Sequence, residues 1–458
     1  MFTSITWQDW ESCAGDRGAL LLRAIADYKI SPDFCGALDA SRYFAGDNVT
    51  VSRKTVLQAR KIETRDADGR RHVRSAAADV VGNRIGSGFL FRFICQQNQF
   101  LLGNGCILPD GKIKAMLGSD FDHQLALLGE KALIHGVSWG FWNADHLEVL
   151  PAAVDGESGY FALLDEMSGE ARLGVLFFRI ARDKPMYVRL FEAEGVTVLR
   201  EEKSGLIPVI PRRAYVRTCR TDALGASCLG ESNWPALPIL PLLANSDGRS
   251  ELTPAIRAKI DAYDNILSDF ADNLDRANDV YWVLNNFGGT TDDIAEMLAE
   301  IQRIKAVCSL SDGTGSSSTA EPHTIEVPYA ARQAALTLLE KALYDDFMAL
   351  DLNALTGGSL TNVAIRAACA GLNLKCDRYE WQVFRFVQSL LRLLGVDTDE
   401  IRFQRQTIGN DSEIVADIAA MRGDIDHRTA LKLNPYVQPD EIEGILAKDI
   451  PESGGLPA

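Results

Sequence analysis

The sequence predicts an α+β protein in which helices and strands occupy separate stretches of the chain. Short runs rich in Val, Phe and Tyr, separated by Gly, Pro and Asp, fill residues 137–211 and are typical of strands. Apolar residues recur at helical spacing before this region and again in three long stretches between residues 253 and 394. With 458 residues, 47% of them hydrophobic, the chain is long enough for several packed cores, roughly three domains by length alone.

The part of the chain before residue 137 is predicted to be mainly helical. Helix-like spacing begins near Trp7, SRYFAGDN (41–48) is typical of a turn, and DADGRRH (66–72) indicates an exposed loop. The apolar stretch RIGSGFLFRFICQQNQFLLGNG (84–105) predicts a buried helix that ends at Gly-Asn-Gly. Apolar residues at 121, 125, 128, 132 and 133 form one face of a further helix closed by Gly136. After the strands, the proline-rich residues 233–252 read as an extended connector.

Two long helices of similar length follow. Thr253 as N-cap and Pro254 at the first helical position mark the start of one of them, over about 253–277. The other covers about 328–352, and both carry an apolar stripe spaced three and four residues apart. We expect these stripes to pack the two helices together. The packing residues are predicted to include Ile260, Tyr263, Leu267, Phe270, Leu339, Leu343 and Phe347.

A small insertion, residues 279–327, separates the two helices. It reads as a strand (VYWVL, 280–284), the turn NNFGG, a helix from Thr291 to about Lys305, and a strand (AVCSL, 306–310). The loop SDGTGSSSTAEP (311–322) and a strand (TIEVP, 324–328) complete it. After the second long helix, Gly357-Gly358 must break helical structure. A third helix is predicted over about 361–394, and the remainder contains two or three shorter helices.

Composition and motifs exclude several kinds of function. The net charge of −16 argues against a protein that grips nucleic acid through a basic surface. No apolar run approaches membrane-spanning length and the start lacks a signal-peptide pattern, so we expect a soluble, non-secreted protein with no membrane partner. Nine cysteines without a CxxC pair indicate reduced, mostly buried thiols in the cytosol. His135 reads as a core residue, and no metal, cofactor or catalytic signature appears, so we expect no enzyme and no cofactor.

The order of segments resembles the portal (head-tail connector) proteins of tailed double-stranded DNA bacteriophages, most closely the family from phages with long non-contractile tails. The segment SELTPAIRAKIDAYDNILSDFADNLD (250–275) is similar to the family's first stem helix. Residues 327–380 look like its second stem helix, tunnel loop and long wing helix, and residues 423–445 resemble a helix-turn-helix crown segment. SRYFAGDN (41–48), residues 83–105 and residues 135–150 are similar to earlier segments of the family.

The resemblance implies a portal subunit with named parts. These are a wing of helices and a β-rich region (1–250), stem helix 1 (251–278), a small α/β clip (279–327), stem helix 2 (328–352), a tunnel loop (353–361), a long wing helix (362–395) and a helical crown and tail (396–458). The tunnel loop would face DNA through Asn353, Leu355, Thr356, Gly357, Gly358, Ser359 and Thr361. The clip would dock partners through Trp282, Phe287, Ser311, Asp312 and Ser316. A plain helix–helix turn with Ser359 as the N-cap of the next helix stays open for the loop.

The resemblance also implies a function. Twelve subunits typically form a ring at one capsid vertex, through which the terminase motor drives double-stranded DNA during packaging and from which DNA leaves on infection. The implied partners are other copies of the chain, the terminase large subunit, a head-completion adaptor, the scaffold and the major capsid protein. The chain would assemble in the host cytoplasm and reside in the virion. The alternatives are a generic cytosolic oligomeric scaffold and a capsid-associated hydrolase.

Overall fold

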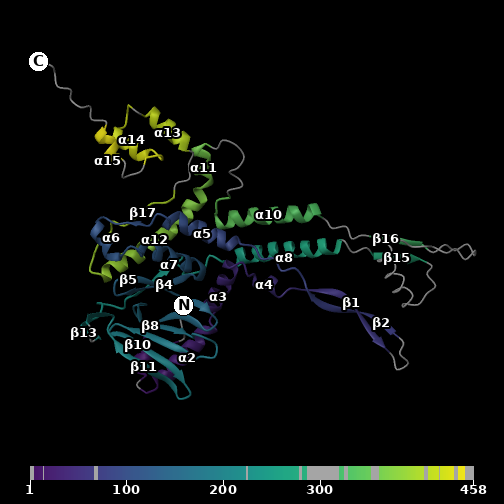
Figure 1. Cartoon of the computed structure of the whole chain (residues 1–458), viewed down its shortest axis with the longest axis horizontal. Helices are drawn as coiled ribbons and strands as arrows, with labels where there is room; N and C mark the ends of the chain where they lie inside the picture. The colour runs from purple at the N-terminus through teal and green to yellow at the C-terminus, as the bar shows by residue number, and fades with distance from the viewer. Residues whose placement is uncertain are drawn as a thin grey trace, which may run out of the picture. The chain divides into compact units, whose positions relative to one another are not determined.

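The computed structural model combines helices and strands, as the sequence predicts (Figure 1). It describes residues 5–13, 15–65, 71–222, 225–277, 281–285, 319–323, 329–351, 361–406, 411–421, 423–437 and 442–448. The chain divides into two compact units. The first unit is Met1–Ala37, Phe93–Glu251 and Phe347–Ala458, and the second is Leu38–Arg92 and Leu252–Asp346.

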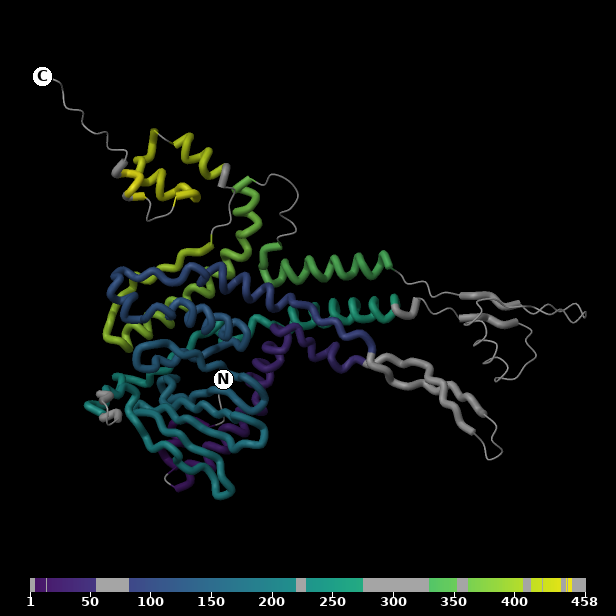
Figure 2. The backbone as a smooth tube through the Cα atoms, in the orientation of Figure 1, coloured from purple at the N-terminus to yellow at the C-terminus, as the bar shows by residue number. Residues whose placement is uncertain are grey.

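A six-stranded antiparallel sheet forms much of the first unit, and its strands neighbour one another in chain order (Figure 2). The strands are β6 (Ala153–Asp155), β7 (Ser158–Leu164), β8 (Ala171–Phe178), β9 (Tyr187–Glu192), β10 (Gly195–Glu202) and β11 (Gly205–Arg213). The β-rich middle predicted for residues 137–211 is therefore confirmed. Gly174 in β8 is required by close packing, because a side chain there would collide with the hydroxyl of Tyr160.

The N-terminal helices of the first unit cover this sheet. They are α1 (Trp7–Ser12), α2 (Arg17–Lys29) and the start of α3 (Pro32–Phe44). Tyr28 of α2 is fully buried and donates from its hydroxyl to the carbonyl oxygens of Ala152 (3.1 Å) and Tyr160 (3.2 Å). Its ring lies 4.8 Å from that of Phe161, so both the polar and the apolar parts of this side chain have partners in the sheet.

A second layer of the first unit is built on the three-stranded sheet β14-β4-β5. Its strands are β4 (Val137–Asn143), β5 (His146–Pro151) and β14 (Ile239–Leu243), packed against α7 (Phe121–His135) and α12 (Ala370–Leu393). Gly129 of α7 and Gly140 of β4 leave room for Tyr379 and Phe386 of α12, which a side chain at either glycine would strike. Gly136 ends α7 with φ of +91°, as the sequence predicts. His135 is a core residue, and burial lowers its pKa to about 4.

One long helix of the first unit remains, α5 (Phe89–Leu102), whose first turn belongs to the second unit. The other elements of the first unit are short. They are β3 (Cys106–Ile107), α6 (Gly111–Leu117), β12 (Val216–Asp222), β13 (Gly225–Ser232), α11 (Asn362–Ala368), β17 (Arg402–Phe403), α13 (Asp411–Ala420), α14 (His427–Leu433) and α15 (Ile442–Lys448). Two predictions need correction here. The third long helix is two helices, α11 and α12, that meet at Cys369, and the connector at 233–252 contains strand β14.

The second unit contains the two long helices, α8 (Pro254–Ala277) and α10 (Tyr329–Phe347), which lie side by side in Figures 1 and 2. Thr253 caps α8 by accepting from the amide of Ile256 at 3.3 Å, which confirms the predicted start. The unit also contains α4 (Val49–Ser52) and the hairpin of β1 (Thr55–Arg65) and β2 (Arg71–Val81), which the sequence did not predict.

The insertion between α8 and α10 is described only at one pair of strands, β15 (Tyr281–Asn285) and β16 (Thr319–His323). Strand β15 matches the predicted strand at 280–284. Strand β16 falls mostly within residues 311–322, which the sequence predicts to be a loop, so that part of the prediction is wrong. The predicted helix from Thr291 and the strands at 306–310 and 324–328 lie outside the described residues.

The structure also bears on the cysteines, on membrane-spanning helices and on metal-binding groups. The described cysteines are free thiols, but Cys35, Cys219 and Cys228 are exposed, so the expectation that most are buried is wrong. Over the described ranges, no helix has both the length and the apolar content needed to cross a membrane. The same residues contain no group of three His, Cys, Asp or Glu side chains placed to hold a metal ion.

Candidate functional site

Helices α8 and α10 form an antiparallel pair within the second unit. Near one end, Lys259 of α8 forms an ion pair with Asp346 of α10. Near the other end, the rings of Phe270 and Tyr329 lie 5.6 Å apart. These two contacts join the start of each helix to the end of the other. An ion pair and an aromatic contact thus hold the two helices together at opposite ends.

Phe89 of α5 packs against both helices near the Lys259–Asp346 contact. Its ring lies 4.9 Å from that of Tyr263 in α8 and 6.4 Å from that of Tyr344 in α10, edge-on in both cases. The predicted packing residues are buried to different degrees. Ile260, Leu343 and Phe347 are buried, whereas Tyr263, Leu267, Phe270 and Leu339 are only half-buried. Half-buried apolar side chains leave part of each stripe uncovered within one chain.

A polar stripe on another face of α8 binds a backbone segment that has no regular structure. Asp264 accepts the amide of Ser87 at 3.0 Å, Ser268 accepts that of Ile85 at 3.1 Å, and Asp272 accepts that of Asn83 at 2.7 Å. We call these three bonds the α8 ladder. The acceptors are spaced four residues apart on the helix and the donors two residues apart on the segment. The ladder thus satisfies the polar backbone of residues 83–87, which no strand partner does in the described structure.

Asp264 is the most buried member of the α8 ladder. It has no exposed surface, and it also accepts from the side-chain amide of Asn48 at 2.8 Å. Burial raises its pKa above the ordinary aspartate value, although its hydrogen bonds act in the opposite direction. Sequence reasoning missed this stripe. The only signal was Asp264, Ser268 and Asp272 at intervals of four, a pattern equally typical of a solvated helix face.

The chain is firmly held where it leaves α10, just before the predicted tunnel loop. The ring of Phe347 stacks on that of Phe93 at 4.6 Å. Three residues further on, Leu350 exchanges two hydrogen bonds with the side-chain amide of Gln96: its own amide donates at 2.8 Å and its carbonyl oxygen accepts at 3.0 Å. Between them, Met348 takes φ of +58°, a conformation typical of a residue that ends a helix.

A buried lysine secures the same helix end. Lys375 of α12 donates to the carbonyl oxygen of Phe347 at 3.1 Å, and its ammonium lies 3.0 Å from the centre of the Phe347 ring. The ammonium also pairs with the carboxylate of Glu251 at 2.7 Å, and both side chains are only 14% exposed. Burial lowers the pKa of Lys375, while Glu251 opposes that shift. One cation therefore satisfies a terminal helix carbonyl, an aromatic face and a buried carboxylate.

The chain is also held where it leaves the predicted loop. Thr361 is the N-cap of α11 and accepts from the amide of Ala364 at 3.3 Å. The amide of Asn362 donates to Glu413 of α13 at 2.7 Å. The alternative in which Ser359 is the N-cap of the next helix is therefore wrong, because α11 begins two residues later than that alternative requires.

Both ends of residues 352–360 meet in one hydrophobic cluster. The cluster consists of Phe100, Leu350, Ile365, Cys369, Leu372 and Cys376. Leu350 precedes the loop and Ile365 follows it. The chain is therefore anchored by contacts on either side of residues 352–360.

The structure describes only some of the predicted site residues. Of the tunnel-loop set, Thr361 is described, and Asn353, Leu355, Thr356, Gly357, Gly358 and Ser359 lie outside the described residues. Of the clip set, the backbone of Trp282 lies in β15, and Phe287, Ser311, Asp312 and Ser316 lie outside them.

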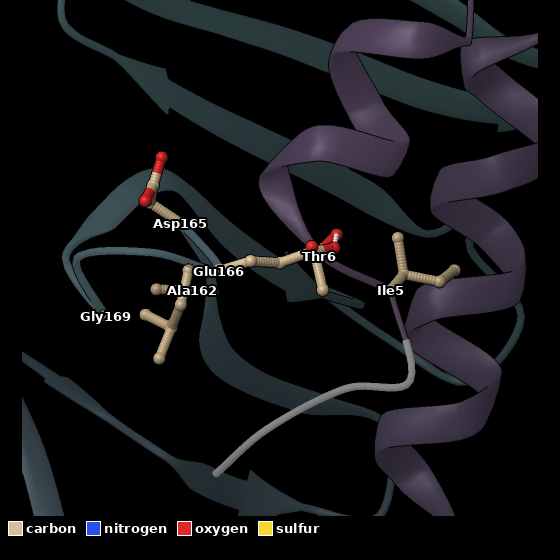
Figure 3. A pocket seen from close by; sticks show the side chains of 7 residues that line it. Ile5, Thr6, Ala162, Asp165, Glu166 and Gly169 are labelled. Atoms are coloured by element: carbon tan, nitrogen blue, oxygen red, sulfur yellow. Dashed lines mark hydrogen bonds between the residues drawn. The ribbon is translucent and has the colours of Figure 1, made fainter.

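A small pocket in the first unit lies where the N-terminal segment meets the turn between β7 and β8 (Figure 3). The side chains of Thr6 and Glu166 point toward each other there and form a hydrogen bond of 2.7 Å. Asp165 accepts from the side-chain amide of Gln8 at 3.1 Å. These polar groups join α1 to the β7–β8 turn, so we assign the pocket a structural role.

Comparison with known proteins defines the class to which this fold belongs, that of the portal proteins of bacteriophages. The family model described as "Phage portal protein, SPP1 Gp6-like" matches residues 38–454, so the chain belongs to that family. Two curated portal proteins are similar to it. That of Clostridium phage phiCD119 is 30% identical over 237 residues, 48% of this chain and 51% of the relative. That of Bacillus phage SPP1 is 30% identical over 226 residues, 46% of this chain and 43% of the relative. The chain thus spans about half the length of the curated relatives it matches.

Proposed function

We propose that this chain forms the ring at one vertex of a phage capsid through which double-stranded DNA is packaged and later ejected. Membership of the portal family supports this proposal. The observation that carries it is the anchoring of the chain on both sides of the proposed tunnel loop, where Leu350 and Ile365 meet in one hydrophobic cluster.

In this proposal the parts of the chain have separate tasks. Helices α8 and α10, within residues 251–278 and 328–352, form the stem that lines the channel. Residues 1–250 and 362–395 form the wing, 279–327 the clip, 353–361 the tunnel loop and 396–458 the crown and tail. The half-buried stripe residues of the stem support this division, because apolar surface left uncovered in one subunit can be covered by a neighbouring one.

The tunnel loop would face the DNA. Asn353, Thr356, Ser359 and Thr361 carry polar groups that can bind phosphates without adding charge, and Gly357 and Gly358 permit backbone changes as DNA advances. Leu355 would pack against the loop of the neighbouring subunit. An acidic subunit supports passage without strong binding, because few phosphates would be neutralised.

The clip would dock the terminase large subunit during packaging and a head-completion adaptor afterwards. Trp282, Phe287, Ser311, Asp312 and Ser316 are the residues proposed for these contacts. The scaffold and the major capsid protein would contact the wing and crown. Assembly would take place in the host cytoplasm, and the mature location would be the portal vertex of the virion.

An exposed stripe on α12 would contact the next subunit in the ring. It comprises Leu374, Arg378, Trp381 and Arg385, spaced four, three and four residues apart. Trp381 is 65% exposed and Leu374 is 61% exposed, which is unusual for such large apolar side chains. A second copy of this chain suits the stripe as partner, because the copy carries a net charge of −16 and the stripe carries two arginines.

Single-particle imaging of the purified protein tests the ring directly. The expected result is a closed ring with a central channel and a countable number of subunits, twelve in the simplest case. A population of monomers or irregular aggregates at micromolar concentration would contradict the proposal. Hydrolysis of nucleic acid or peptide by the same preparation would instead favour a capsid-associated hydrolase.

A further inference from the structure

The hairpin of β12 and β13 in the first unit places two exposed cysteines opposite each other. In the antiparallel register, Cys219 of β12 is the direct partner of Cys228 of β13. Arg217 and Glu231 are the partners two positions further along, and they form a salt bridge of 2.8 Å. A β-bulge lies between these two pairs, and Leu229 has no partner in the register there.

The four side chains share one face of the hairpin. Residues 217 and 219 are two apart on β12, so their side chains point to the same side of the strand. The thiol of Cys228 lies 3.8 Å from the carboxylate of Glu231, the residue that pairs with Arg217. The two sulfur atoms therefore project from the same side of the ladder.

The backbone spacing also suits a disulfide. Directly opposed residues of an antiparallel pair have Cα atoms about 4.5–5.5 Å apart. Disulfides join residues whose Cα atoms are about 4.4–6.8 Å apart. Both cysteines are exposed, so a small oxidant in solution can reach either of them.

We propose that Cys219 and Cys228 form a disulfide within the hairpin when the protein meets a low-molecular-weight disulfide such as oxidised glutathione. The thiolate of one cysteine attacks the oxidant, which forms a mixed disulfide and releases one molecule of reduced glutathione. The second thiolate then attacks the cysteine sulfur of the mixed disulfide and releases the second. Two protein thiols lose two protons and two electrons, and one glutathione disulfide becomes two thiols.

The redox conditions around the protein would decide whether Cys219 and Cys228 are free thiols or a disulfide. The cytosol keeps thiols reduced, whereas extracellular surroundings allow disulfides to persist. If the chain is a virion protein, which rests on the proposed function, the pair is reduced during assembly and can oxidise after release. The bond would then close the hairpin around residues 220–227.

Peptide mapping after oxidation tests the proposal without any packaging assay, so its failure and that of the proposed function are distinguishable. Trypsin cleaves after Arg217, Arg220 and Arg249, so Cys219 and Cys228 fall in the separate peptides 218–220 and 221–249. After incubation of the full chain with oxidised glutathione and blocking of remaining thiols, most copies should give these two peptides joined. Cys35, which is also exposed, serves as internal control and should carry a glutathione adduct instead.

Single variants separate the two steps. Cys219→Ser should accumulate a glutathione adduct at Cys228, and Cys228→Ser should accumulate one at Cys219, each mass corresponding to one added glutathione. The proposal is overturned if wild-type protein keeps adducts on both cysteines without joining them. It is also overturned if joined peptides arise only in covalent dimers on a non-reducing gel.

Discussion

Asp264 shows how a single buried carboxylate can hold a segment of backbone at a cost in stability. Its two oxygen atoms accept from the amide of Ser87 and the side chain of Asn48. Asn48 cannot turn its own oxygen toward Asp264, because that oxygen accepts from the amides of Thr50 and Val51. The ionised carboxylate therefore offers one acceptor to each of these two donors.

Asp264→Asn is expected to lower the free energy of unfolding by about 1–3 kcal/mol at pH 7, because one acceptor becomes a donor that faces Asn48. The folded-state pKa of Asp264 is raised, so this group favours folding most at acidic pH and loses that contribution as the pH rises through the raised pKa. The variant lacks this titration. The difference in the free energy of unfolding between wild type and Asp264→Asn should therefore be larger near pH 4 than at pH 7, as measured by chemical denaturation.

Asp269→Asn is the matched control for that measurement. Asp269 lies on the same helix, but its side chain is 54% exposed and pairs with Lys54 at the surface. Loss of such a pair costs about 0–1 kcal/mol. The role given to Asp264 would be contradicted if both variants lost the same free energy of unfolding. It would also be contradicted if the loss in Asp264→Asn did not depend on pH.

The Lys375–Glu251 pair is expected to show strong coupling. Lys375→Met leaves a buried carboxylate and the Phe347 carbonyl without their donor, which should cost about 3–5 kcal/mol of stability. Adding Glu251→Gln should recover a large part of this loss, because the uncompensated charge is gone. A double-mutant cycle in thermal or chemical unfolding measures the coupling, and Lys341→Met, at an exposed position on α10, is the control. Additive effects of Lys375→Met and Glu251→Gln would show that the pair does not act as a unit.

At the scale of the element, α12 has one face in the core and one in solvent. Its buried face includes Leu372, Tyr379 and Phe386, while Leu374 and Trp381 are exposed. Trp381→Glu should leave the fold intact and shift the protein from rings to smaller species in size-exclusion chromatography at equal concentration, since central aromatic residues dominate interface energies. Met167→Glu, at a position that is 93% exposed, should assemble normally. Unchanged assembly of Trp381→Glu would remove α12 from the subunit contact.

The segment between α10 and α11 can be tested by restricting its backbone. Gly357→Pro combined with Gly358→Pro should still allow rings and docking, because Leu350 and Ile365 keep both ends in place. DNA packaging should fail, because proline fixes backbone angles that a moving loop must change. Alanine at both positions should give an intermediate defect in a filling assay. Normal filling by the double-proline variant would exclude a moving loop.

At the scale of the whole molecule, the proposed function links the net charge to the passage of DNA. A ring of twelve chains would carry 12 × −16 = −192 charges, so its channel cannot act as a strong binder of phosphates. Purified rings should not retard linear double-stranded DNA in a gel-shift experiment at about 0.15 M salt, where the Debye length is about 8 Å. Stable retardation under those conditions would contradict passage without strong binding.

Sequence reasoning reached some elements of this molecule and missed others for physical reasons. The start of α8 at Pro254 and the end of α7 at Gly136 were predictable because caps act locally. The apolar stripe along the second long helix was visible as well. The meeting of Leu350 and Ile365 in one cluster was not, because a contact between two segments is not written in the spacing of either one. The β1–β2 hairpin was also missed, because its strands are charged and do not alternate cleanly between apolar and polar residues.

The α8 ladder has a geometric consequence for how far a helix can guide an extended chain. Four helical residues advance about 6.0 Å, whereas two extended residues advance about 6.6 Å. The two repeats therefore drift apart by about 0.6 Å per rung, and four helical residues also turn about 40° beyond a full circle. Each further rung would therefore be less well aligned than the one before it. The pattern ends after three rungs, because the next positions on α8 are Ile260 and Arg276, neither of which carries a side-chain acceptor. The mismatch between the helical repeat and the extended repeat thus limits how long a backbone segment α8 can hold in this way.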